Sequence, residues 1–557
     1  MLPLVPSSPA ALRLAAPTRS VAWLALAAGM GALACGSSGG SSDDCATAAC
    51  APGAVPGPAP TAPPPASDMM SPAPVNPGSS SELPDPDLPL AGEPQPPQPG
   101  TPAPTGPAAP PVIGDAQALL DASVRFYGAQ RSGDGANWLL SGATCHMNDG
   151  ESIQSELSGG WYDAGDHVKV TLSIAYASYV MLKAYDAFPD AFLDRDSQRY
   201  EGAPNGVPDV LDEARYATDY LVKAHLSENE LVSMVGDDEF DHNYWGACQQ
   251  QEGLDVMEGG GPRAVSTEAN ADVAGITAAS LALMARLYRQ FDPALADSYQ
   301  LHATQIYQIG KANPSGTAVD LYAQTGDGWF DEMLAGSAEM YRLTSESTYL
   351  TDALDFNTRI ENHGWAPNYS ESADFSRHSL YVGGQAEAVG EFWKLDVESY
   401  AAKVSTNEFT VGAIYIDDWG MLRYAAAAAF SAALYAQVTS DTGARDLAIS
   451  QLNYIAGQNS YNRSFVIGVG TNSPQNPHHR NSDALGVLLT GALVAGPTQR
   501  SFMQGRGANA IEITAPGYED VTEDYVGNEV ALDYNAGLVG LGAFGVMQQR
   551  AAAGAGL

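Results

Sequence analysis

The stretch YAAAAAFSAALYA, at residues 424–436, is made almost entirely of alanine and larger apolar side chains. A second stretch of this kind, GITAASLALMARLY, covers residues 275–288. A helix that is apolar on nearly every face is buried among other helices. The two stretches therefore predict a domain whose core is built from helix packing against helix.

Further segments repeat apolar residues at three- and four-residue spacing, the pattern of amphipathic helices. They cover residues 114–133, 207–226, 331–344 and 528–549. Alternating strand patterns are scarce, and no second linker interrupts the globular composition after about residue 113. We predict one all-α domain at residues 114–552. Its length exceeds that of an ordinary domain and favours a closed, repetitive toroid or barrel of helices.

Proline, alanine, glycine and serine dominate residues 51–112, for example in APGAVPGPAPTAPPPAS. Such a composition cannot bury a core and favours an extended spacer with polyproline II character. We therefore predict a disordered linker at residues 36–113, which holds the globular domain away from a surface.

The N-terminus has the pattern of an export signal at residues 1–35. Arg13 and Arg19 precede the apolar run VAWLALAAGMGALAC, which ends at Cys35. A basic segment, a short apolar core and small residues before a cleavage point are typical of secretion signals. Cys35 also fits a bacterial lipoprotein site, so the sequence predicts either a secreted protein or a lipoprotein tethered to the outer surface.

The charge of the chain excludes one large class of partner. Lysine and arginine number 26 against 65 aspartates and glutamates, a formal net charge of −39. Such a surface repels phosphate backbones, so we expect no nucleic-acid partner. A neutral carbohydrate meets no such repulsion. Of the five cysteines, only Cys145 and Cys248 lie in the globular part, and sequence leaves their pairing open.

The stretch SGGWYDAGDHVKV, at residues 158–170, sets Asp163 and Asp166 in a glycine-bounded turn. An ionised carboxylate within hydrogen-bond reach of water can activate that water for attack. The same stretch offers Trp161 and His167 as contacts for a sugar. The alternative is a solvated Asp-Gly turn ahead of a helix.

A second constellation is GYEDVTEDYVGNEVALDYNAG at residues 517–537, which contains Asp520, Glu529 and Tyr534. Glu529 opens an apolar segment, where a desolvated carboxyl group keeps its proton to higher pH. That property suits a general acid. The alternative is an acidic helix N-terminus stabilised by the helix dipole.

A third constellation, SFVIGVGTNSPQNPHHRNSD at residues 464–483, presents His478, His479 and Arg480 from a loop. Their donors suit sugar hydroxyls or the orientation of a carboxylate. Zinc is not expected, because no third ligand lies at a suitable spacing. The alternative is an exposed polar turn.

Together these three stretches resemble glycoside hydrolase family 9, the inverting cellulases and related β-glucanases. The segments FYGAQRSG (126–133), WGMLRYAAAAAF (419–430) and YIAGQNSYNRSFVIGVGTN (454–472) agree with the same family. The resemblance extends from about residue 115 to residue 547.

The resemblance implies an (α/α)6 barrel and a role for each matching residue. Glu529 is expected to be the general acid, and Asp166 the general base, with Asp163 helping to hold the attacking water. His478 and Arg480 are expected beside the scissile bond, Tyr534 at the sugar undergoing cleavage, and Trp245 stacked on a sugar. Asp520 belongs to the signature of the acid.

The expected partner is a β-glucan polysaccharide or oligosaccharide, and the protein is expected to be a monomer. No cofactor is required. Structural calcium is allowed without an assigned position, and zinc is not expected, since the pair in TCHM (144–147) lacks an upstream cysteine. Two alternatives stay open: an exo-acting hydrolase on oligosaccharides, mixed-linkage glucan, xyloglucan or glucosamine polymers, and a carbohydrate-binding surface protein without activity.

Overall fold

The computed structural model describes residues 109–134, 137–195, 203–317, 322, 328–360, 364–499 and 516–555. The predicted export signal at residues 1–35, including Cys35, lies outside these ranges. So does the predicted linker up to residue 108. Their assignments stay predictions.

Within the described ranges, the core of the domain is a closed ring of inner helices. Each inner helix contacts the next one in chain order, and the last contacts the first. The inner helices are α2 (Thr171–Ala187), α5 (Ala271–Tyr288), α7 (Phe330–Thr344), α9 (Ala373–Leu380), α11 (Met421–Thr439) and α15 (Leu532–Ala555).

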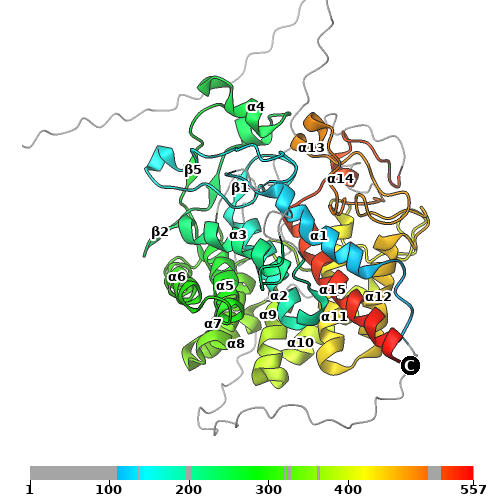
Figure 1. The fold of residues 1–557 in the computed structure, drawn as a ribbon. Coiled ribbons are helices and arrows are strands. Elements are labelled where there is room, and N and C mark those ends of the chain that lie inside the picture. The colour runs from blue at the N-terminus through cyan, green and yellow to red at the C-terminus, as the bar shows by residue number, and fades with distance from the viewer. Residues whose placement is uncertain are drawn as a thin grey trace, which may run out of the picture. The chain divides into compact units, whose positions relative to one another are not determined.

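A second set of helices packs outside this ring (Figure 1). The chain alternates between an outer helix and an inner helix from α1 to α15, which is the topology of an (α/α)6 barrel and confirms the predicted fold class. The outer helices are α1 (Ala116–Gln130), α3 (Asp209–Ala224), α6 (Pro293–Ala312), α8 (Ser347–Arg359), α10 (Ala386–Ala402) and α12 (Thr442–Ala456).

The inner ring closes because small residues let its helices approach closely. Every residue of α11 from Met421 to Ala436 is buried. A side chain on Gly537 of α15 would meet the backbone nitrogen of Ala427 at 2.6 Å. On the other side of the ring, a side chain on Gly275 of α5 would meet the backbone of α7 at 2.5 Å. The alanine-rich stretch that predicted a buried helix is thus the face on which α15 packs.

Helix α5 is long and apolar enough to span a membrane, but 94% of its 18-residue window is buried inside the protein. We therefore assign it to the core of the barrel. All the segments predicted as helices from their periodicity are confirmed, as α1, α3, α5, α7, α11 and α15.

One boundary differs from the prediction. Glu529 does not open α15 but has an extended backbone, with φ −59° and ψ 147°, between the short helix α14 (Tyr525–Asn528) and α15. The acidic side chain is therefore positioned by a turn ahead of the helix and not by the helix itself.

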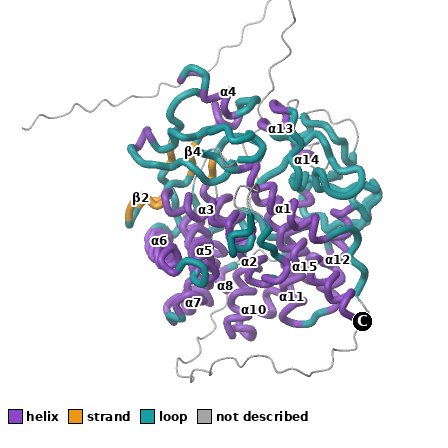
Figure 2. The backbone as a smooth tube through the Cα atoms, in the orientation of Figure 1, coloured by secondary structure: helices purple, strands orange, loops and turns teal. Residues whose placement is uncertain are grey.

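Short strands and helices lie within the loops that lead into the inner helices, as Figure 2 shows. Strands β1 (Lys169–Val170), β4 (Met234–Val235) and β5 (Val265–Ser266) form an antiparallel sheet in the order β1-β4-β5, with Lys169 opposite Val235 and Val235 opposite Val265. Strands β2 (His225–Ser227) and β3 (Glu230–Leu231) form a hairpin, and α4 (Cys248–Glu252) and α13 (Arg480–Leu485) lie in these loops.

Candidate active site

The predicted catalytic carboxylates lie in the loops that enter two neighbouring inner helices. Asp163 and Asp166 precede α2, and Glu529 precedes α15. The backbone N–H of Leu532, the first residue of α15, donates to the carbonyl of Asp163 over 2.9 Å. Because α2 and α15 are neighbours in the ring, residues from opposite ends of the domain meet at one place.

The glycine between the two aspartates allows a third segment to join them. The carbonyl of Gly165 accepts a hydrogen bond from the backbone N–H of Arg480 at 2.8 Å. A Cβ at Gly165 would lie 2.2 Å from the carbonyl oxygen of His478, so only glycine permits this approach. The turn at residues 163–166 (the DAGD turn) and the loop that carries His478 and Arg480 (the histidine loop) are therefore held in direct contact.

Asp163 is buried and has a raised affinity for its proton. Burial, followed by the charge of Asp166, raises the pKa of Asp163 to about 7. The hydroxyl of Tyr322, in the chain ahead of α7, donates to its carboxylate. Near neutral pH this carboxyl group exists in both protonation states.

Asp166 is also buried, but its surroundings favour the ionised form. Burial alone would raise its pKa, yet the hydrogen bond and charge of His242, together with the charge of Arg480, hold the pKa below its ordinary value. The Nδ1 atom of His242 lies 2.6 Å from Oδ2 of Asp166. A buried carboxylate that stays ionised has the properties of a base.

The surroundings of Glu529 shift its pKa in the opposite direction, upward. Burial raises its pKa above the ordinary value, although hydrogen bonds from Trp419 and Tyr534 partly oppose the shift. The indole Nε1 of Trp419 donates to Oε2 over 2.6 Å, and the hydroxyl of Tyr534 donates to the same oxygen over 2.9 Å. Both donors address Oε2, so a proton on this carboxyl group is carried by Oε1.

The histidine loop runs alongside the segment that carries Glu529. His478 pairs with Glu529 in a parallel bridge, and its Nδ1 donates to the carbonyl of Thr522 over 2.8 Å. Burial and the charge of Arg480 lower the pKa of His478 to about 3, so its imidazole is neutral above this pH. A neutral ring with Nδ1–H fixed leaves Nε2 as an acceptor.

Arg480 and Trp245 form one face of the site. The guanidinium of Arg480 lies 4.9 Å from the centre of the Trp245 ring and donates to the carbonyl of His242. The Trp245 ring is partly exposed and lies 4.7 Å from the ring of His478, while its Nε1 donates to Asp483 over 2.6 Å. The aromatic face and the guanidinium are thus fixed beside the histidine.

Asp520 anchors the backbone of the histidine loop. Its carboxylate accepts the backbone N–H groups of Gln475 and Asn476, each over 3.0 Å. These two residues lie just ahead of His478 in the loop. Asp520 therefore acts on the position of the loop through its backbone and is a positioning residue in this geometry.

His479, which stands between the two predicted contacts His478 and Arg480, has a structural role. Its side chain is buried, with Nε2 bonded to Gln130 over 2.8 Å. Its Nδ1 accepts the backbone N–H of Ser482 over 3.1 Å and so caps α13.

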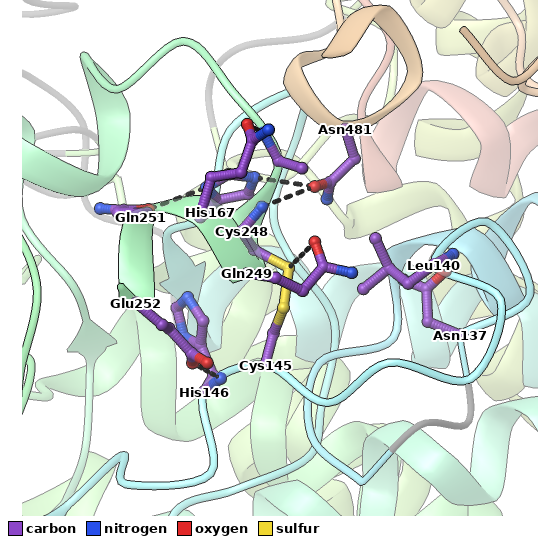
Figure 3. Close-up of a disulfide and its surroundings, with 12 residues drawn as sticks. Asn137, Leu140, Cys145, His146, His167, Cys248, Gln249, Gln251, Glu252 and Asn481 are labelled. Atoms are coloured by element: carbon purple, nitrogen blue, oxygen red, sulfur yellow. Dashed lines mark hydrogen bonds between the residues drawn. A yellow bond between two sulfur atoms is a disulfide. The ribbon is translucent and has the colours of Figure 1, made fainter. Parts of the chain in front are cut away.

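The predictions for Trp161 and His167 as substrate contacts are wrong, because both side chains are fully buried. Trp161 donates from Nε1 to Glu213 over 3.1 Å and packs at 4.7 Å from the ring of Tyr127. His167 bonds Gln251 through Nδ1 and Asn481 through Nε2 (Figure 3). Both residues brace the loop of Asp163 and Asp166 from within.

A disulfide joins Cys145 to Cys248 and answers the question left open by the sequence (Figure 3). It ties the chain ahead of the DAGD turn to α4, and the backbone N–H of Cys248 donates to Asn481 over 2.9 Å. Cys145 is therefore not available as a zinc ligand. In the ranges that the structure describes, no group of three or more His, Cys, Asp or Glu side chains is arranged to hold a metal ion.

Three residues at the site were not found from the sequence: His242 beside Asp166, Tyr322 beside Asp163, and Trp419 beside Glu529. Trp419 lies in a stretch that resembles the family, but local spacing does not link it to Glu529, and no motif marks His242 or Tyr322. Only contact through the folded chain identifies these partners.

The sequence model of glycosyl hydrolase family 9 matches residues 117–542. Endoglucanase A of Bacillus pumilus is 32% identical over 454 residues, which are 76% of this chain and 65% of that protein. This chain therefore spans slightly less than two thirds of that relative. The crystal structure of the cellulase Cel9M of C. cellulolyticum is 29% identical, with a TM-score of 0.67 over 78% of this chain and 99% of its own. Its complex with cellobiose aligns with a TM-score of 0.66 over 78% of this chain and 99% of its own.

Proposed function

The chain belongs to glycosyl hydrolase family 9, and from this premise we propose that it hydrolyses β-1,4-glucosidic bonds within cellulose or related β-glucans, with inversion at the anomeric carbon. The observation that carries the proposal is the opposite protonation preference of two carboxyl groups in one site. The partners of Asp166 hold its pKa below the ordinary value, and burial raises the pKa of Glu529 above its ordinary value. Paired carboxyl groups whose pKa values are pushed apart are the arrangement of an acid and a base.

In the proposed reaction, Asp166 removes a proton from a water molecule as the water oxygen attacks the anomeric carbon. The bond to the glycosidic oxygen breaks, and its electron pair stays on that oxygen, which takes the proton from Oε1 of Glu529. The attack comes from the face opposite the leaving group, so a β-linkage yields an α-anomer. Each turnover leaves Asp166 protonated and Glu529 ionised, and proton exchange with solvent restores both.

Asp163, His478 and Arg480 are assigned supporting roles in this reaction. Asp163 shares its turn with Asp166 and helps to hold the water. His478 pairs with Glu529, and the backbone of Arg480 bonds to Gly165 beside Asp166, so the two side chains can supply an acceptor and donors for sugar hydroxyls. Tyr534 fixes Oε2 of Glu529, and Trp245 offers a partly exposed ring on which a sugar can stack.

A substrate panel tests this proposal. The purified protein is incubated with carboxymethylcellulose, lichenan and cello-oligosaccharides, and viscosity is followed together with the release of reducing ends. We expect viscosity to fall steeply for few new ends, the behaviour of an endo-acting enzyme. Slow loss of viscosity with release of short products would establish the exo-acting alternative. Absence of turnover on every glucan would refute the proposal.

Proton NMR of the first products tests the stereochemistry. Inversion predicts that new reducing ends appear first as the α-anomer and then equilibrate. Early appearance of the β-anomer would contradict the assignment of Asp166 as a base that activates water.

We also propose that the protein is exported, either as a secreted protein or as a lipoprotein tethered to the outer surface through Cys35, on the pattern of residues 1–35 alone. Cell fractionation and labelling with a radioactive fatty acid test this in the producing cell. Label that is lost in a Cys35→Ser variant supports a tether, and unlabelled protein in the medium supports ordinary secretion.

A further inference from the structure

The short helix α13 is joined to the segment of chain that carries Trp245. Asn481 of α13 accepts the backbone N–H of Cys248, at the end of that segment, over 2.9 Å (Figure 3). The guanidinium of Arg480 donates to the carbonyl of His242, at its start. Helix and segment are therefore joined on both sides of Trp245.

The backbone of this segment is also fixed by the rest of the site. At its start, Nδ1 of His242 lies 2.6 Å from the carboxylate of Asp166. At its end, a disulfide joins Cys248 to Cys145. These contacts set the position of the backbone at Trp245. The orientation of the indole ring depends in addition on rotation about two side-chain bonds, and contacts of the backbone leave this rotation free.

The indole ring has one hydrogen-bond donor, and Asp483 of α13 accepts it. Nε1 of Trp245 donates to Oδ2 of Asp483 over 2.6 Å. The bond that joins Cβ to the ring favours two broad orientations, which differ by about half a turn. Half a turn would carry Nε1 to the other side of that bond and away from Asp483. The hydrogen bond therefore selects one of the two orientations.

The selected orientation decides which part of the ring a ligand can reach. The guanidinium of Arg480 lies 4.9 Å from the centre of the Trp245 ring, and the ring of His478 lies 4.7 Å from it. The Trp245 side chain is nevertheless partly exposed. After half a turn, the ring would present a different part of its surface to solvent, beside the same two neighbours. Stacking on an aromatic ring depends on this geometry.

The bond to Asp483 is made at the surface, so the core of the domain does not depend on it. Asp483 is exposed and Trp245 is partly exposed. A buried donor without an acceptor is costly, whereas a donor at the surface can bond to water. Removal of the acceptor should therefore leave the fold intact and free the ring to rotate. A ring that is fixed in advance loses less freedom when a ligand binds.

We propose that Asp483 is a positioning residue, which holds the ring of Trp245 in the orientation that stacks on the substrate. The inference rests on the proposed glucanase function, in which Trp245 binds a sugar, and adds a residue that acts through this ring. The carboxyl groups of Asp166 and Glu529 are held by other partners, which are His242 for the first and Trp419 and Tyr534 for the second. Asp483 should therefore affect the binding of substrate and not the rate of bond cleavage.

Three substitutions are compared. Asp483→Ala removes the acceptor, and Asp483→Asn keeps an acceptor oxygen at the same place. Asp297→Ala is the matched control, because Asp297 is an exposed carboxylate on the outer helix α6 that accepts from Arg289, also over 2.6 Å. Thermal unfolding of each protein checks that the fold is retained.

Binding of cellohexaose is measured by calorimetry in proteins that also carry Glu529→Gln, which prevents turnover. The freedom that one side chain loses on binding predicts an affinity roughly two- to ten-fold weaker for Asp483→Ala. Asp483→Asn and Asp297→Ala should bind as tightly as the parent protein. In the active enzyme, Asp483→Ala should raise KM by a similar factor and leave kcat unchanged, the pattern of an interaction made equally in the ground state and the transition state.

A second background shows whether Asp483 acts through the ring. In protein that carries Trp245→Ala, the group to be positioned is absent, so Asp483→Ala should cause no further loss of affinity. A loss of the same size with and without the ring would give Asp483 a role independent of Trp245 and would overturn the inference.

The inference is also overturned by unchanged affinity in Asp483→Ala, by an equal loss in Asp483→Asn, or by absence of cellohexaose binding in every protein. Turnover of glucans by the wild-type protein decides separately whether the proposed function holds. A wild type that cleaves glucans, together with an Asp483→Ala variant that binds as the control does, refutes the positioning role alone.

Discussion

The proton on Glu529 is the feature of the site that can be tested most sharply. Glu529→Gln replaces the acid by an amide of nearly the same shape. The amide carbonyl can take the place of Oε2 and still accept from Trp419 and Tyr534. The amide nitrogen then takes the place of Oε1, the atom that carries the proton. The substitution therefore removes the transferable proton and preserves the contacts that position the side chain.

The expected size of the effect depends on the leaving group. General acid catalysis contributes about 10²- to 10⁴-fold. This corresponds to about 2.7–5.5 kcal/mol of transition-state stabilisation. We expect kcat on cello-oligosaccharides, whose leaving sugar needs a proton, to fall by that factor. On dinitrophenyl cellobioside, whose leaving group departs as a stable anion, the loss should be less than about ten-fold, because the acid contributes little there.

Steady-state kinetics on both substrates, for wild type and for two variants, measures the difference. Asp166→Asn is the control, since loss of the base should slow both substrates alike. Equal losses on the two substrates for Glu529→Gln, in protein that unfolds at the wild-type temperature, would refute the assignment of Glu529 as the acid. Undiminished turnover in Asp166→Asn would likewise remove Asp166 from the role of base.

Two further predictions concern the supports of the site. In Trp419→Phe, Glu529 loses a donor that favours its ionised form, so its pKa rises further. Because the acid must be protonated to act, the alkaline limb of kcat/KM against pH should move to higher pH, and a limb that stays or moves down would contradict this reasoning. Replacing both Cys145 and Cys248 by alanine opens a crosslink between residues 103 apart, and should lower the free energy of unfolding by about 2–5 kcal/mol in urea titrations. An unchanged midpoint would show that the crosslink adds no stability.

Much of the fold could be predicted from local patterns. A buried helix must be apolar around its whole circumference, so the stretches at residues 275–288 and 424–436 reveal α5 and α11 directly. Outer helices such as α3 bury one face, and their periodicity is equally visible. Helix α9 has only eight residues and ends in a kink, so its pattern is too short to recognise.

The candidate site, too, could be predicted only in part from the sequence. Asp163, Asp166, Glu529 and His478 stand in dense polar motifs, and such motifs are visible in the sequence as departures from ordinary helix or loop composition. The positions of their side chains are not visible there. Trp161 illustrates the limit, because an aromatic residue beside a polar turn can equally face a sugar or the core, and the structure places it in the core.

The sequence by itself determined the class of fold, the residue types of an acid and a base, and the family, because helix periodicity and local motifs are properties of neighbouring residues. Only the tertiary structure shows what shifts the pKa of each carboxyl group. The hydrogen bond and charge of His242 and the charge of Arg480 hold the pKa of Asp166 below its ordinary value. Burial raises the pKa of Glu529 against the opposing hydrogen bonds of Trp419 and Tyr534. Desolvation and charge act through space, so residues far apart in the chain set each pKa only when the ring of helices closes.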